Sequence, residues 1–137
     1  MNLFVAGTIS IFACKQKFDA SNVPESVKAS FAKQFPGATA KWSKDEGNYE
    51  AEFELNENKM SAVFDANGSM EENEMEIKVQ DLPSSTAAYV NEHYKGKTID
   101  EAEKITKADG TVNYEIEIDG KEVIFDSAGN FLKEEKD

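Results

Sequence analysis

The sequence predicts an α+β protein, a tandem repeat of a helix plus an about four-stranded antiparallel sheet, with the two copies in one compact body. Three observations predict this class: an internal repeat, a change of apolar period from 3.6 to 2 within each copy, and Gly- and Asn-containing turns between the predicted strands. The chain has 137 residues, and each copy alone is too short to bury much surface. We therefore expect the two copies to pool their cores.

The repeat divides the chain after a short N-terminal segment. The sequence VPESV at residues 23–27 recurs as LPSST at 82–86, and NYEAEF at 48–53 recurs as NYEIEI at 113–118. Similar segments follow one another in the same order in both copies, which favours duplication of a structural unit. The predicted organisation is a leader and tether at residues 1–19, a first repeat at 20–80 and a second repeat at 81–137.

Each copy is predicted to begin with a helix. Pro24 and Pro83 stand where the first turn would start, a position that tolerates proline because its amide has no partner there. In the first copy Val27, Phe31 and Phe35 are spaced by four, so they fall on one stripe of a helix. This stripe is expected to pack against the sheet.

Acidic and apolar side chains then alternate along the predicted strands. Residues 49–55 show this alternation and residues 114–119 repeat it. Such a period of two predicts an antiparallel sheet with one buried face and one solvated face. The solvated face would be acidic, and it is our candidate binding site, formed by Glu50, Glu52, Glu54, Glu115, Glu117 and Asp119. The plainer interpretation is a solvated surface that keeps the sheet soluble.

Charge and composition exclude several classes of partner. The chain carries 27 acidic and 15 basic residues, a net charge of -12. An excess of acid disfavours binding to nucleic acid or to an anionic membrane surface. A single cysteine excludes an internal disulfide and any metal site built from several cysteines.

The N-terminus predicts export. Residues 3–13 form an uncharged apolar run that is too short to span a bilayer but suits a signal peptide. The run ends at Ala13-Cys14, which resembles the lipobox of a bacterial lipoprotein, so Cys14 is the expected lipid attachment residue. We therefore expect a periplasmic protein or one anchored by lipid in the outer membrane. The alternative is a buried N-terminal segment with an ordinary free cysteine.

Catalytic and metal motifs are weak. The single imidazole, His93, falls near the end of the second predicted helix, where a cation is mildly favourable, and it cannot build a usual metal site alone. Two turns that begin at Asp65 and Asp126 start like calcium loops but lack the later oxygen ligands. We therefore expect no enzyme and no cofactor, with calcium uptake by the acidic strands left open.

The repeated motifs carry a resemblance to a known family. The Val/Leu-Pro at each helix start, the Tyr-x-x-x-Phe/Ile strands and the Phe-Asp-x-x-Gly turns resemble the PepSY-like, or beta-lactamase-inhibitor-like, family of exported proteins of Bacteroides-type bacteria. The resemblance covers about residues 20–137 and implies a non-catalytic exported module. It transfers no set of contact residues.

Three functions follow as hypotheses. The first is an exported binding module of the cell envelope that engages an unknown protein or peptide through its sheet surface. The second is a calcium-responsive periplasmic protein that binds cations through its acidic strands. The third is a small hydrolase whose site lies between the repeats; it requires buried carboxylates in a cleft.

Overall fold

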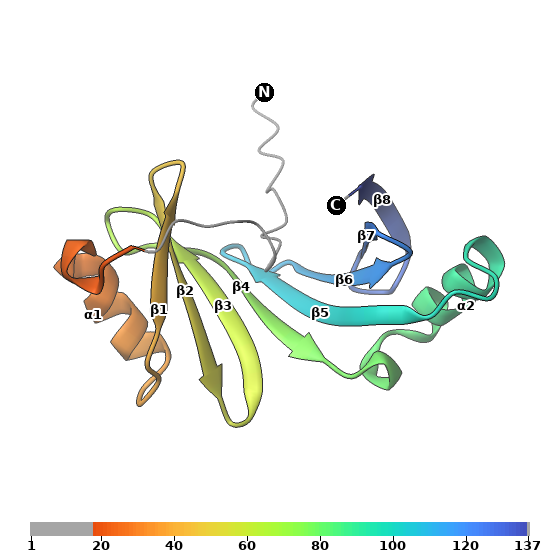
Figure 1. The fold of residues 1–137 in the computed structure, drawn as a ribbon, viewed down its shortest axis with the longest axis horizontal. Helices are drawn as coiled ribbons and strands as arrows, with labels where there is room; N and C mark the ends of the chain where they lie inside the picture. The colour runs from red at the N-terminus through yellow and green to blue at the C-terminus, as the bar shows by residue number, and fades with distance from the viewer. Residues whose placement is uncertain (1–17, 137) are drawn as a thin grey trace.

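A single curved antiparallel sheet forms the body of the protein. The computed structural model describes residues 18–136, and Figure 1 shows two helices at opposite ends of the sheet. The strands follow one another in chain order, each paired with the next. This confirms the α+β class with antiparallel strands. The helices are α1 (Glu25–Gln34) and α2 (Ser84–His93), and the strands are β1 (Lys41–Asp45), β2 (Asn48–Leu55), β3 (Asn58–Phe64), β4 (Met70–Ile77), β5 (Ile99–Lys107), β6 (Val112–Ile118), β7 (Lys121–Phe125) and β8 (Phe131–Lys136).

The element order is a short 3-10 helix, an α-helix and four strands, and then the same series again. The 3-10 helices are Ala20–Asn22 and Val79–Asp81, and the expected boundary between residues 80 and 81 falls inside the second. Pro24 and Pro83 are the N-cap residues of α1 and α2, one position before the first helical turn. A proline costs nothing at that point, since no intrahelical amide bond is lost.

Both helices cover the same face of the sheet. Directly opposed residues of antiparallel strands point to the same side, and the opposed pairs can be followed across the sheet. From Phe53 on β2 the partners run to Phe125 on β7, by way of Met60, Met75, Lys104 and Tyr114. Phe53 packs under α1 and Phe125 packs under α2. Within residues 18–136, the opposite face of the sheet therefore has no helix on it.

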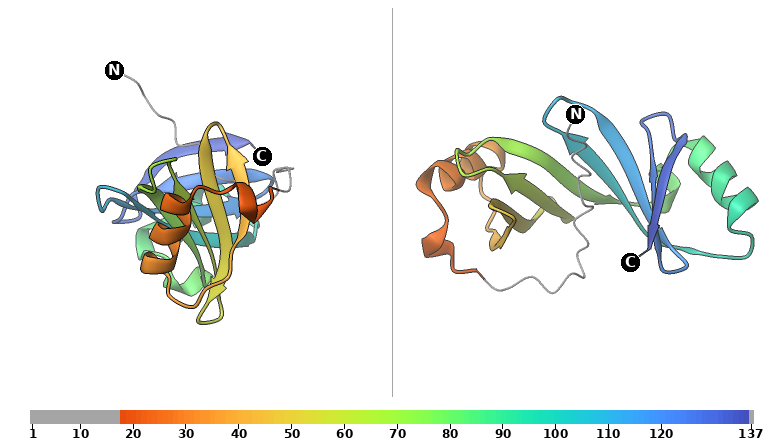
Figure 2. Two further views of the ribbon diagram at one scale, coloured as in Figure 1. Left: turned by 90° about the vertical axis from the view of Figure 1, so that its left-hand side faces the viewer. Right: turned by 90° about the horizontal axis from the view of Figure 1, so that it is seen from above.

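The expectation of a pooled core is wrong, because the buried apolar residues form two separate clusters. Under α1, the ring of Phe31 lies 5.0 Å from that of Phe53 and 5.4 Å from that of Trp42. Under α2, Val90 and Tyr94 pack with the second cluster. Strands lie about 4.8 Å apart, so eight of them are far wider than one helix. The two helices therefore cover different halves of the sheet, as Figure 2 shows from above.

One turn of each half is fastened to the start of its helix. Ser26 Oγ donates a hydrogen bond to the carbonyl of Ala66, 3.0 Å away, and Ser85 Oγ donates to the carbonyl of Ala128 in the same way. The contact is close enough to require glycine: a Cβ at Gly129 would lie 2.3 Å from Ser85 Oγ. The repeated Phe-Asp-x-x-Gly motif thus has a structural role.

Two features of the predicted N-terminus lie outside the described residues. Cys14 and the apolar run at 3–13 precede the described residues, so lipid attachment stays a prediction. Within residues 18–136, no helix has the length and apolar character needed to cross a membrane.

Candidate functional site

The helix-free face of the sheet carries buried acidic side chains. Six glutamates on this face are at most 8% exposed: Glu50, Glu72, Glu74, Glu103, Glu115 and Glu122. The strand register places them there, since the opposed pairs Glu52–Ser61–Glu74 and Glu76–Glu103–Glu115 cross neighbouring strands on the side away from the helices. We call this surface, with the partly buried Glu52, Glu76 and Glu117, the acidic face.

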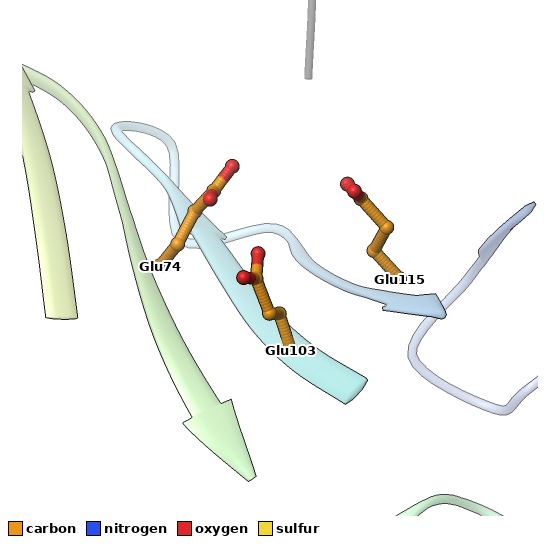
Figure 3. A group of neighbouring side chains, drawn as sticks. All are labelled: Glu74, Glu103 and Glu115. Carbon is orange, nitrogen blue, oxygen red and sulfur yellow. The ribbon is translucent and has the colours of Figure 1, made fainter. Parts of the chain in front are cut away.

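Three of these glutamates converge at the centre of the acidic face. Glu74, Glu103 and Glu115 come from β4, β5 and β6, and each offers a carboxylate oxygen within 4.8 Å of the other two. Glu103 and Glu115 are directly opposed, while Glu74 lies diagonally from Glu103 across the next strand pair. Figure 3 shows the three side chains rising from the same side of the sheet. We call this group the glutamate trio.

Several of these buried oxygens have no hydrogen-bond donor. Among the described residues, Glu74 has only the carboxyl groups of Glu72 and Glu103 as hydrogen-bond neighbours, and no amide, hydroxyl or basic group donates to it. Oε2 of Glu115 likewise has no donor. Glu74 is only 3% exposed and Glu115 only 5%. Burial of an ionised carboxylate without a donor or counter-ion is costly, and the usual escape is to bind a proton or a cation.

Burial raises the pKa of every member of the trio. The pKa of Glu74 rises to about 11, first because of burial and then because of the charge on Glu103. Burial likewise raises the pKa of Glu115 to about 9, with Glu122 adding repulsion, and that of Glu103 to about 7. At neutral pH Glu74 and Glu115 therefore hold a proton in the absence of any cation.

A small pocket opens beside the trio. It has a volume of about 130 Å³, and its walls combine apolar and charged groups from four strands. The side chains that line it from the acidic face are Glu52, Glu74, Glu76 and Glu103, together with Lys59 and Ser61. Four acidic groups against one lysine make this pocket favourable for a positively charged group.

The structure corrects the expectation that the acidic ladders form a fully solvated face. Glu50 and Glu115 are buried, Glu52 and Glu117 are partly buried, and Glu54 is exposed at the end of β2. The sheet is curved (Figure 1), and on the inner side of a curved sheet the side chains of neighbouring strands converge. The predicted alternation of sides along the strands is right. The acidic side chains are nevertheless buried, because the inner side of a curved sheet is less open to water than the surface of a flat sheet.

Asp119 is the second correction. It lies in the turn after β6 rather than on the strand, with a φ of 52°. Its Oδ1 accepts an ion pair from Lys97 Nζ at 3.3 Å. It therefore does not belong to the acidic face as expected.

Sequence reasoning did not select two members of the trio, Glu74 and Glu103. Glu74 stands in a strand whose alternation is visible in the sequence, but the alternation does not say which strand lies next to which. Only the order β4–β5–β6 and the register bring these side chains together with Glu115.

His93 takes no part in this site. It is the last residue of α2, where we expected it, and its ring stacks on Tyr89 with centroids 4.1 Å apart. The carboxylates of the two loops that begin like calcium sites are also engaged by backbone. Asp65 Oδ1 accepts from the amides of Asn67 and Ser69, and Asp126 makes the equivalent bonds.

Solved structures similar to this one share its fold. A protein described as periplasmic from Bacteroides eggerthii has a TM-score of 0.77 at 15% identity, with 83% of this chain and 88% of that chain covered. A DUF2874 family protein from Bacteroides uniformis has a TM-score of 0.76 at 18% identity, covering 82% and 88%. A BLIP-like protein from Bacteroides fragilis has a TM-score of 0.70 at 22% identity, covering 82% and 86%.

The sequence itself matches a family model in two overlapping stretches, residues 10–71 and 47–133. A comparison with curated proteins finds no match. The two stretches together span most of the chain, and the structural likeness agrees with them. The chain belongs to the beta-lactamase-inhibitor-like, PepSY-like family.

Proposed function

We propose that this protein is an exported, non-catalytic binding module of the cell envelope that engages a basic protein or peptide through its acidic face. The observation that carries the proposal is the set of buried glutamates on the one sheet face that no helix covers. A partner with lysine or arginine side chains would supply the positive charge and the donors that Glu74 and Glu115 lack.

The pocket beside the trio favours lysine as a contact residue. A lysine stem is apolar and its end is a compact ammonium group. Glu74 and Glu103 line the pocket, so they lie where the ammonium group would arrive. The net charge of -12 would also accelerate the encounter with a basic partner.

A hydrolase remains the weaker alternative. Buried glutamates with raised pKa values are a feature of acid–base catalysis, and the acidic face has them. The pocket of about 130 Å³ is nevertheless smaller than the roughly 300–1,000 Å³ of ordinary ligand sites. Binding of a single side chain fits this volume better than turnover of a substrate.

Export and duplication complete the proposal. The apolar run at residues 3–13 supports a signal peptide, Cys14 supports a lipid anchor, and similar structures include proteins described as periplasmic. The repeated series of one helix and four strands supports an origin of the two halves by duplication.

Binding of short peptides tests this function. Purified domain is immobilised and exposed to lysine-rich, glutamate-rich and neutral peptides of equal length at two salt concentrations. We expect the lysine-rich peptide to bind best, more weakly at high salt, and about tenfold more weakly to the variant Glu52→Lys. Glu92→Lys is the matched control, because Glu92 is exposed on α2, which covers the other face of the sheet. Equal binding of all three peptides, or equal loss in both variants, contradicts the proposal.

A further inference from the structure

The glutamate trio has a geometry that a lysine contact does not require. Three carboxylates from adjacent strands meet in one place, beyond what one ammonium group needs. We propose that Glu74, Glu103 and Glu115 form a binding site for a hard divalent cation, calcium, at the centre of the sheet.

The spacing of the oxygens suits calcium. Oxygen ligands lie about 2.3–2.6 Å from a bound calcium ion, so two on opposite sides of it are about 4.8 Å apart. One oxygen from each member of the trio already lies within 4.8 Å of the others. Bidentate coordination by three carboxylates provides up to six oxygens, which reaches the range of six to eight that calcium takes.

The burial of Glu74 is the independent sign of a missing ligand. The side chain is 3% exposed, only other carboxyl groups lie within hydrogen-bond reach of its oxygens, and it points into the trio. The unpartnered Oε2 of Glu115 lies in the same group. A bound cation satisfies these oxygens and removes the repulsion between the three carboxylates at once.

The donor set selects the kind of metal. The trio presents carboxylate oxygen only, which favours hard cations over zinc or copper. Magnesium requires a nearly ideal octahedron and holds its water tightly, whereas calcium accepts irregular geometry. Side chains fixed on three neighbouring strands cannot easily adjust to an octahedron, so calcium is the better fit.

The charges around the trio attract a cation. The ionisable groups that face it are mostly acidic, with two lysines on the same face: Lys107, directly opposite Glu72, and Lys59, in the wall of the neighbouring pocket. The remaining acidic groups on the acidic face and around it are Glu50, Glu52, Glu72, Glu76, Glu101, Glu117 and Glu122. This site differs from the ladder residues proposed from the sequence, of which only Glu115 is a member, and it does not rest on the proposed peptide partner.

Calorimetric titration of the purified, EDTA-treated domain tests the site. Calcium chloride is added at pH 8 and again at pH 9, because protons compete less with the metal as pH rises, and thermal unfolding is followed in parallel. We expect one ion per chain and a melting temperature that rises with calcium concentration. The variant Glu103→Gln keeps the shape of the side chain and is expected to lose at least about tenfold in calcium affinity. The control Glu92→Gln, on α2 and therefore over the other face of the sheet, should bind as the wild type does.

Two results overturn the proposal: no calcium binding by the wild type, or binding that Glu103→Gln retains. Circular dichroism checks that Glu103→Gln is folded. If that variant does not fold, Glu115→Gln, which removes another proposed calcium ligand, is tested in its place. Repeating the peptide assay in EDTA separates the two functions. Peptide binding that persists without calcium leaves the proposed function standing even when the metal site fails.

Discussion

Glu103 on β5 lies directly opposite Glu115 on β6, and both side chains are buried. Like charges at directly opposed positions destabilise a sheet. The fold therefore places three carboxyl groups together at its centre, and they repel one another when they ionise. This relationship has consequences for stability, pH dependence and ligand binding that can be measured separately.

The stability of the cation-free protein should fall as pH rises. In the unfolded chain glutamate loses its proton near pH 4.5, whereas in the folded protein Glu103 and Glu115 keep theirs to pKa values of about 7 and 9. The folded state therefore binds more protons between these limits, and its advantage is lost as pH increases through them. Urea unfolding in EDTA at pH 5, 7 and 9 should give a decreasing free energy of unfolding. A free energy that increases over this interval contradicts the account.

Replacing a member of the trio with glutamine should stabilise the cation-free protein. Glu115→Gln supplies a neutral group of nearly the same shape, which resembles the protonated acid and removes the cost of holding a proton at high pH. We expect a gain of at least about 1 kcal/mol in unfolding free energy at pH 9, compared with no significant change for Glu92→Gln on the surface of α2. A loss of stability in Glu115→Gln contradicts this account, because it shows that the Glu115 carboxylate already has a favourable partner in the folded protein.

Gly129 should tolerate alanine much less than Gly110 does. Both glycines have φ near +87°, but a Cβ at Gly110 meets no atom within 4 Å, whereas one at Gly129 lies 2.3 Å from Ser85 Oγ and 2.6 Å from Pro83. Gly110→Ala should therefore cost about 1 kcal/mol of backbone strain, and Gly129→Ala should exceed it by more than another 1 kcal/mol. Chemical denaturation of both variants measures the difference. Equal losses show that the turn does not depend on its contact with α2.

The two halves should unfold together although their cores are separate. Phe31 is buried and packs on Trp42 and Phe53, so Phe31→Ala should cost about 3–5 kcal/mol. The β4–β5 pairing joins the halves, with six opposed residue pairs from Glu72–Lys107 to Ile77–Ala102. Fluorescence of Trp42 reports the first half, and far-ultraviolet circular dichroism reports both. The two midpoints should shift by the same amount, and a shift in fluorescence alone contradicts a shared sheet.

Local features of the fold were predictable from the sequence, and long-range ones were not. The spacing of Val27 and Phe31 and the alternation of residues 49–55 identify a helix and a strand, because both depend on neighbouring residues. Pairing of β4 with β5 joins the two copies, and no local pattern specifies it. The separate cores follow from the width of the resulting sheet.

The candidate site shows the same division. The sequence identifies Glu115 as a member of an acidic sheet face, since its side follows from alternation alone. Alternation cannot state how deeply a residue on that face is buried. The neighbours of Glu115, which are Glu74 and Glu103, come from other strands and decide its burial and pKa.

The protonation of the trio tests the central claim most directly. Carbon-13 NMR of the side-chain carboxyl groups, recorded from pH 4 to 10 in EDTA, gives the pKa of each assigned glutamate. The account predicts that Glu115 titrates near 9 and that Glu74 titrates higher still. Titration of both residues between pH 4 and 5, as in an unfolded chain, would show that water reaches these carboxylates and would contradict a buried acidic cluster.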